Sequence, residues 1–114
     1  MADQPKIIQD PLYQLLREGK IDEFNKLKMS GKDCDFTNCD FRNLNLQNLD
    51  ANGLDFTGCY FRQTDMRGID LSNTKMLGAS INGARISGVL FPKELSAEEI
   101  KLSIEYGTRM RYLG

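Results

Sequence analysis

The chain has 114 residues, carries 15 basic against 16 acidic side chains and contains no histidine. This length fits one domain with one hydrophobic core, and no apolar stretch is long enough to span a membrane. The net charge of −1 argues against direct nucleic-acid binding, and the N-terminus lacks the basic start and apolar run of a secretory signal, so we expect a cytoplasmic protein.

Residues 1–31 are expected to form a helical cap. Asp10 and Pro11 make a typical helix start, with the acidic residue as N-cap and proline at the first helical position, and Gly19 marks the end. A second short helix is expected over residues 21–28. Apolar residues line one side of each helix: Leu12, Leu15 and Leu16 in the first, and Ile21, Phe24 and Leu27 in the second.

From Cys34 to Gly88 the chain repeats every five residues, in eleven units without a gap. The units read CDFTN, CDFRN, LNLQN, LDANG, LDFTG, CYFRQ, TDMRG, IDLSN, TKMLG, ASING and ARISG. The third residue of each unit is apolar and the first is small or apolar, so we expect both to point inward and the residues between them to point outward. The central residues are Phe36, Phe41, Leu46, Ala51, Phe56, Phe61, Met66, Leu71, Met76, Ile81 and Ile86.

The fifth residue of each unit explains why no long strand is expected. Ten of the eleven fifth residues are glycine or asparagine, which tolerate the positive φ of a tight turn, and Gln63 is the exception. A turn every five residues favours a square coil in which four units complete one coil of about 20 residues, so that residues 20 apart stack. The expected inner stacks are Phe36, Phe56 and Met76; Phe41, Phe61 and Ile81; Leu46, Met66 and Ile86; and Ala51, Leu71 and Phe91.

This pattern resembles the pentapeptide repeat family, whose units have a small first residue, often Asp or Asn second, and Leu or Phe at the centre. The resemblance covers residues 34–91, about half of the chain. It implies a β solenoid, namely a right-handed quadrilateral β-helix, here of about three coils. We expect this β-helix over residues 32–91, with α-helical caps at both ends and all parts in one folded domain.

Residues 92–114 are expected to form the second cap and a possible dimer interface. Ser96 and Glu99 have the spacing of a capping box at the start of a helix over residues 97–106. The tail over 108–112 alternates charged with apolar residues, which is compatible with a short strand.

Several apolar residues of this segment have no evident partner within the chain. We expect a homodimer joined through them, and the resemblance supports this, since several pentapeptide repeat proteins dimerise through their C-terminal ends. The alternative is that the tail folds back as additional capping. The expected interface residues are Leu102, Ile104, Tyr106, Met110 and Tyr112.

No catalytic residue, cofactor or metal site is expected, and we predict a protein that is not an enzyme. The three cysteines all occupy first positions, which favours buried, reduced thiols; a disulfide or metal at Cys39 and Cys59 is the lesser alternative. The glycines fall at turn positions rather than in a phosphate-binding loop. Aspartates recur at the second position, where we expect them to be solvated, and a flat outer face is not a pocket.

One outer face favours binding to another protein, because arginine and tyrosine are enriched at interfaces. Its candidate partner-binding residues are Arg42, Tyr60 and Arg62. The alternative is an ordinary solvated face on which these arginines pair with nearby aspartates. The sequence therefore predicts a protein-interaction module or scaffold whose partner it does not name.

A second interpretation comes from the resemblance. Some pentapeptide repeat proteins protect DNA gyrase, as in quinolone resistance, by imitating the dense and regular negative charge of duplex DNA. About three coils and a near-neutral surface make this chain poorly suited to that role, unless dimerisation lengthens the rod.

Overall fold

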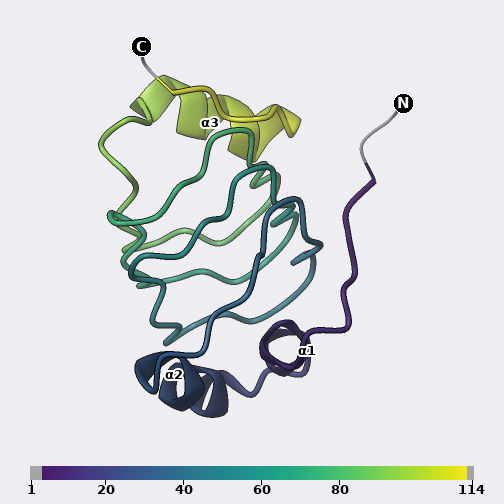
Figure 1. Ribbon diagram of the computed structural model, residues 1–114. Coiled ribbons are helices and arrows are strands. Elements are labelled where there is room, and N and C mark those ends of the chain that lie inside the picture. Colours follow the sequence, from purple (N-terminus) through teal and green to yellow (C-terminus); the bar gives the residue numbers. More distant parts are fainter. Residues whose placement is uncertain (1–3, 113–114) are drawn as a thin grey trace.

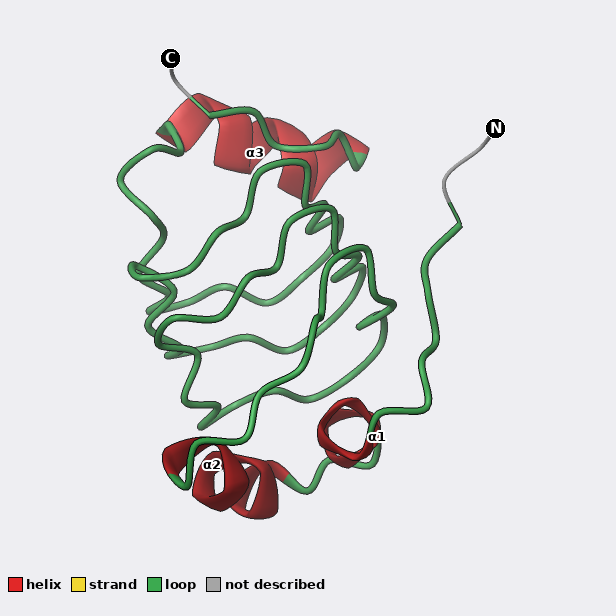
Figure 2. Ribbon diagram, in the orientation of Figure 1, coloured by secondary structure: helices red, strands yellow, loops and turns green. Residues whose placement is uncertain are grey.

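The computed structural model describes residues 4–112 of the chain. It has three helices, α1 (Pro11–Arg17), α2 (Ile21–Met29) and α3 (Ala97–Tyr106), with the repeat region between α2 and α3. Figure 1 shows α1 and α2 at one end of the repeat region and α3 at the other end. The described segments outside the helices are loops and turns (Figure 2). The helices thus lie at the two ends, where the sequence predicts caps.

The first helix starts and stops as predicted. The Asp10 carboxylate accepts a hydrogen bond from the Leu12 amide at 2.8 Å, which satisfies one of the amides left unpaired in the first turn. Gly19 follows the C-cap residue with a φ of 77°, a conformation that glycine adopts without strain. Tyr13 and Leu16 of α1 are fully buried.

The second helix runs one residue further than predicted and ends at Met29. Ile21 and Phe24 are buried beneath it, but Leu27 is 38% exposed, so only part of the predicted apolar stripe is covered. The Phe24 ring lies 6.0 Å from the ring of Phe36, which joins α2 to the first repeat unit.

The segment before α1 adds an unpredicted layer to the repeat region. Lys6 forms a parallel bridge with Cys39: its amide donates to the Asn38 carbonyl at 2.8 Å, and its carbonyl accepts from the Asp40 amide at 2.8 Å. These bonds occupy backbone groups where units 34–38 and 39–43 meet, at the open edge of the first layer, and these groups would otherwise lack a partner.

Residues twenty apart in the repeat region lie side by side, as the five-residue period predicts. The Phe41 amide donates to the Tyr60 carbonyl at 2.8 Å, and the Phe61 amide donates to the Ser80 carbonyl at 2.8 Å. Within residues 4–112 these pairings remain isolated bridges, and no regular strand is assigned. The parallel bridges of the repeat region join Asp40 to Tyr60, Tyr60 to Ser80, Asn45 to Asp65, Asp65 to Arg85, Asp55 to Lys75, and Asp70 to Leu90.

The turn residues adopt the predicted conformation, with one exception. Ten of the eleven fifth positions have a positive φ, but the position that departs is Asn73 rather than Gln63, whose φ is 58°. The side-chain amide of Asn73 instead donates to the Asn52 side chain at 2.7 Å. The turn conformation therefore does not follow residue type at these two positions.

The central residues of the units form the core. Ten of the eleven are buried, and Ile86 is half-buried. Phe41 and Phe61, predicted to stack, have parallel rings with centroids 5.3 Å apart and an interplanar angle of 9°. Phe56 packs edge-on against both, at 5.6 Å from Phe41 and 5.2 Å from Phe61. This geometry is one that aromatic rings prefer in protein cores.

The third helix has the predicted bounds but only half of the predicted capping box. The Ser96 hydroxyl accepts from the Glu99 amide at 3.1 Å, as expected. The Glu99 carboxylate, however, pairs with Arg111, accepting from its amide at 2.9 Å and from its guanidinium at 2.6 Å. Arg111 provides more donors than the Ser96 amide, and the returning tail brings it within reach.

The tail after α3 folds back over the last layer of the repeat region. Figure 1 shows the tail running alongside α3. Met110 is fully buried; its amide donates to the Ala79 carbonyl at 2.9 Å, and its carbonyl accepts from the Gly78 amide at 2.7 Å. Buried Ser103 ties α3 to both parts, accepting from the Ile81 amide at 2.9 Å and donating to the Thr108 carbonyl at 2.7 Å. The tail forms no strand, but it covers the end of the stack.

Candidate functional site

The second-position side chains of the units serve the turns. In seven units an Asp or Asn at this position accepts a hydrogen bond from the amide two residues later, at 2.9 to 3.2 Å. Hydrogen bonds from Thr37 and Ser72 hold the pKa values of Asp35 and Asp70 below their usual range. These carboxylates therefore stabilise local turns, as such side chains commonly do. The seven residues are Asp35, Asp40, Asn45, Asp50, Asp55, Asp65 and Asp70.

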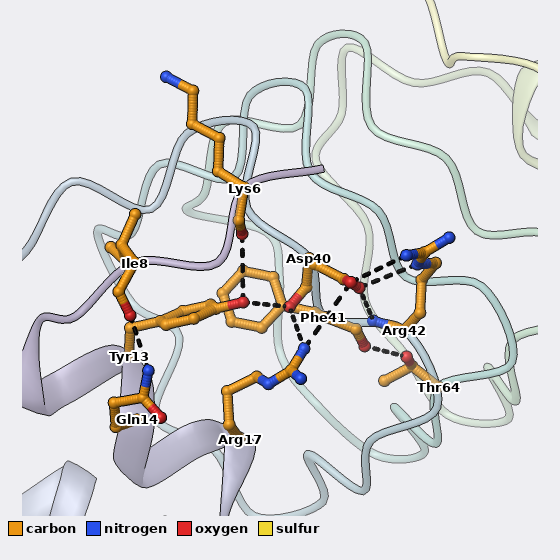
Figure 3. Close-up of polar contacts among 9 residues, drawn as sticks. All are labelled: Lys6, Ile8, Tyr13, Gln14, Arg17, Asp40, Phe41, Arg42 and Thr64. Atoms are coloured by element: carbon orange, nitrogen blue, oxygen red, sulfur yellow. Dashed lines mark hydrogen bonds and ion pairs between the residues drawn. The ribbon is translucent and has the colours of Figure 1, made fainter. Parts of the chain in front are cut away.

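Asp40 departs from the prediction that these aspartates are solvated, since it is only 6% exposed. Figure 3 shows its carboxylate between the guanidinium groups of Arg42 and Arg17. Arg42 donates to both carboxylate oxygens, at 3.0 and 2.9 Å, and Arg17 lies 3.8 Å away. Burial raises the pKa of Asp40, but the hydrogen bonds and charge of Arg42 outweigh it, so the pKa is lowered overall.

The Tyr13 side chain connects α1 to the unit that contains Asp40. Its hydroxyl lies 2.6 Å from the Asp40 carbonyl and 3.2 Å from the Lys6 carbonyl, and its ring packs edge-on against Phe41 at 5.4 Å (Figure 3). The segment before α1, α1 itself and unit 39–43 thus meet at one buried hydroxyl. Burial raises the pKa of Tyr13, which keeps this hydroxyl protonated as a donor.

Replacing Asp40 by asparagine should lower the free energy of unfolding at pH 7 by about 2 kcal/mol, because the variant keeps the turn acceptor but loses the charged pairing. A lowered pKa means that this contribution is present above the unfolded pKa of about 3.9 and is lost as the pH falls through the folded pKa. Urea unfolding across pH 7 to pH 3 should therefore show the difference between Asp40→Asn and wild type shrinking. Asp70→Asn, at an exposed turn, is the control and should change stability by less than about 0.5 kcal/mol. A difference for Asp40→Asn that is independent of pH would contradict this role of the charge.

The three predicted partner-binding residues lie on one face. Asp40 and Tyr60 form a parallel backbone bridge, so the residues two positions later, Arg42 and Arg62, are also neighbours. In agreement, the Asn43 amide donates to the Arg62 carbonyl at 2.9 Å. Both arginines are exposed. Arg42 pairs with Asp40, as the solvated-face alternative predicts, whereas no carboxylate among residues 4–112 forms an ion pair with Arg62.

Two further arginines reach this face, and no pattern in the sequence predicts either of them. Arg109, from the tail, lies over the Tyr60 ring at 5.0 Å, donates to the Gly78 carbonyl at 3.1 Å and bonds the Tyr60 hydroxyl. Arg17, from α1, reaches Asp40 from the opposite end. We call the surface formed by these side chains the arginine face. It comprises Arg17, Asp40, Arg42, Tyr60, Arg62 and Arg109.

The predicted dimer-interface residues divide into two groups. Leu102 and Tyr106 on α3 are 38% and 72% exposed, and Ile104 is half-buried. Met110 lies in the core instead, and the half-buried Tyr112 accepts a hydrogen bond from the Met76 amide at 2.7 Å. The structure thus removes Met110 from the candidate interface, because the tail covers the last layer of its own chain.

The three cysteines are free thiols. Cys39 and Cys59 are buried and Cys34 is half-buried. Burial raises the pKa of Cys34 to about 12 and that of Cys39 to about 11. Within residues 4–112 no cluster of three or more potential metal-ligating side chains is found.

Comparison with known protein families matches pentapeptide repeats, in eight copies, over residues 32–58 and 55–91. No curated protein and no solved structure gave a match. None of the helices in the described part of the chain is both long and apolar enough to cross a membrane. The matched residues cover more than half of the chain. They contain the units in which residues twenty apart form parallel backbone bridges. The chain therefore belongs to the pentapeptide repeat family.

Proposed function

We propose that this protein is a non-catalytic protein-binding scaffold that associates with a second copy of itself through α3. The observation that carries this proposal is the exposure of Leu102 and Tyr106, one turn apart on α3, while the buried residues of the same helix are Glu99 and Ser103. The two isoleucines of the helix pack half-buried against the core, which leaves Leu102 and Tyr106 as its exposed large apolar groups. Closed two-fold dimers are the commonest homo-oligomers, and they use one surface patch twice.

The proposed scaffold is a right-handed quadrilateral β-helix of about three coils over residues 32–91, capped by residues 1–31 and 92–114. Membership of the family and the pairing of residues twenty apart support this form. We place it in the cytoplasm, a location supported by its three free thiols.

Mimicry of duplex DNA, the alternative function, would require a dense negative surface. Arg42 and Arg62 instead stand next to each other on one face of the repeat region. We therefore favour a protein partner whose recognition does not depend on mimicry of DNA over binding to DNA gyrase.

Light scattering coupled to chromatography tests the self-association. The chain has a mass of 13.0 kDa, so the dimer should give twice 13.0, about 26 kDa. Leu102→Glu combined with Tyr106→Glu should yield the monomer, because charges would be buried between the two copies. Leu90→Glu is the matched control, since Leu90 is 59% exposed on the repeat region and should leave the dimer intact. A wild-type mass of 13 kDa at every concentration would refute the proposal.

A further inference from the structure

The arginine face carries far more positive charge than the chain as a whole. Among residues 4–112 it gathers four guanidinium groups and one carboxylate, in a protein whose net charge is −1. The carboxylate of Asp40 is largely buried under Arg42 and Arg17, so it offers little negative charge to solvent. We infer that the arginine face binds an acidic segment of a partner protein, rich in Asp and Glu, and this inference rests on the proposed role as a protein-binding scaffold.

A comparison between units shows why Arg62 is the centre of this site. In CDFRN and TDMRG the arginine at the fourth position pairs with the aspartate two residues before it: Arg42 with Asp40, and Arg67 with Asp65 at 2.7 Å. In CYFRQ the second position is Tyr60, so Arg62 lacks the acid that its counterparts have. Since no carboxylate in the described part of the chain forms an ion pair with Arg62, its exposed guanidinium is suited to a carboxylate supplied from outside, which it can bind through two parallel hydrogen bonds.

Tyr60 also orders the neighbouring arginine. Arg109 is held against its ring and hydroxyl and against the Gly78 carbonyl. Arg42 is likewise held, by two hydrogen bonds to Asp40. Side chains that are already ordered lose less conformational entropy when a partner binds.

The spacing of the face fits an extended acidic segment. Arg42 and Arg62 lie on adjacent layers, whose backbones are about 4.8 Å apart. Arg109 lies on the α3 side of this pair, and Arg17 lies on the α1 side. Alternate side chains of an extended peptide are about 6.7 Å apart, and the long side chain of Arg62, between the ordered Arg42 and Arg109, can adjust to this spacing. Carboxylates on one side of such a segment can therefore meet successive guanidinium groups.

Charge on the neighbouring faces favours a protein segment over a nucleic acid. One neighbouring face, formed by units 34–38, 54–58 and 74–78, carries the carboxylates of Asp35 and Asp55. A nucleic acid, with phosphates distributed around its whole backbone, would meet these carboxylates, whereas a narrow peptide can remain on the arginine column.

Fluorescence anisotropy with a short fluorescein-labelled peptide of alternating Glu and Ser tests the inference. Wild type should bind this peptide, bind the version with Gln in place of Glu at least about tenfold more weakly, and lose affinity as salt rises. Arg62→Glu should weaken binding at least about tenfold, since it reverses the central charge. Lys75→Glu is the matched control, because it makes the same change of charge on an exposed residue of a different face, where Lys75 forms a backbone bridge with Asp55. This variant should bind the peptide within about twofold of wild type.

Tyr60→Asp is a second variant that is compatible with the fold, because most other units carry an acid or asparagine at this position. It should give Arg62 an internal partner and weaken peptide binding to a similar degree. The inference is overturned if Arg62→Glu binds as wild type does, if Lys75→Glu loses as much affinity, or if a single-stranded oligonucleotide binds more tightly than the peptide. Arg62 lies on a side of the repeat region, whereas α3 lies over its end. Loss of peptide binding in a protein of 26 kDa would therefore reject this inference alone, and a 13 kDa protein that binds the peptide would reject only the self-association.

Discussion

Replacing Phe41 by alanine should lower the free energy of unfolding by about 4 kcal/mol, the largest effect expected from any single substitution in this chain. Phe41 is fully buried, and its ring lies within 6 Å of four other aromatic rings. These rings belong to α1 and to two successive layers of the repeat region. They are Tyr13, Phe36, Phe56 and Phe61.

The size of this effect follows from the cavity that the substitution would leave. Two flat layers cannot collapse around a missing ring, because their backbones are joined by hydrogen bonds such as that from the Phe41 amide to the Tyr60 carbonyl. Small domains are stable by about 5 to 15 kcal/mol, so the variant would be close to unfolding.

Urea unfolding followed by circular dichroism, at one fixed protein concentration, measures this change. Leu77→Ala is the control, because Leu77 is 48% exposed and should contribute less than about 0.5 kcal/mol. A loss below about 1 kcal/mol for Phe41→Ala would mean that the aromatic cluster is not the core of the fold.

Met110→Ala should lower the free energy of unfolding by about 3 kcal/mol. Met110 is the fully buried residue of the tail, and both of its backbone groups bond to the last layer of the repeat region. Losing its side chain removes apolar contacts from the end of the stack, which a repeat protein must keep covered.

This effect distinguishes a cap from a dimer interface. If Met110 acts within its own chain, the loss should be the same at every protein concentration, and the variant should keep the oligomeric state of wild type. Thr108→Ala, at an exposed neighbour in the tail, should change stability by less than about 0.5 kcal/mol. A Met110→Ala protein that is as stable as wild type but monomeric would return Met110 to the interface.

The repeat region was predictable because the same residue pattern recurs every five residues in the sequence. Each unit directs its first and third residues inward and places its fifth in a turn, so a five-residue count identifies Phe41 and Phe61 as a stack without knowledge of the rest. The helices were predictable for a similar reason, since Asp10 and Ser96 mark their starts with local hydrogen bonds.

The arginine face was only partly predictable. Arg42 and Arg62 follow from the period, but Arg17 and Arg109 arrive from segments whose paths no local pattern specifies. The burial of Asp40 has the same origin, because it depends on α1 placing Arg17 and Tyr13 above that unit. Contacts between distant segments depend on tertiary packing, which overrides local preference.

The interval of twenty residues is what brings Arg42 beside Arg62, and every proposal about this surface depends on it. Nuclear Overhauser contacts in solution measure this interval most directly. Main-chain contacts should join Asp40 to Tyr60 and Asp55 to Lys75, and ring contacts should join Phe41 to Phe61. Contacts at another interval, or none between these pairs, would contradict the layered repeat and place the arginines on different surfaces.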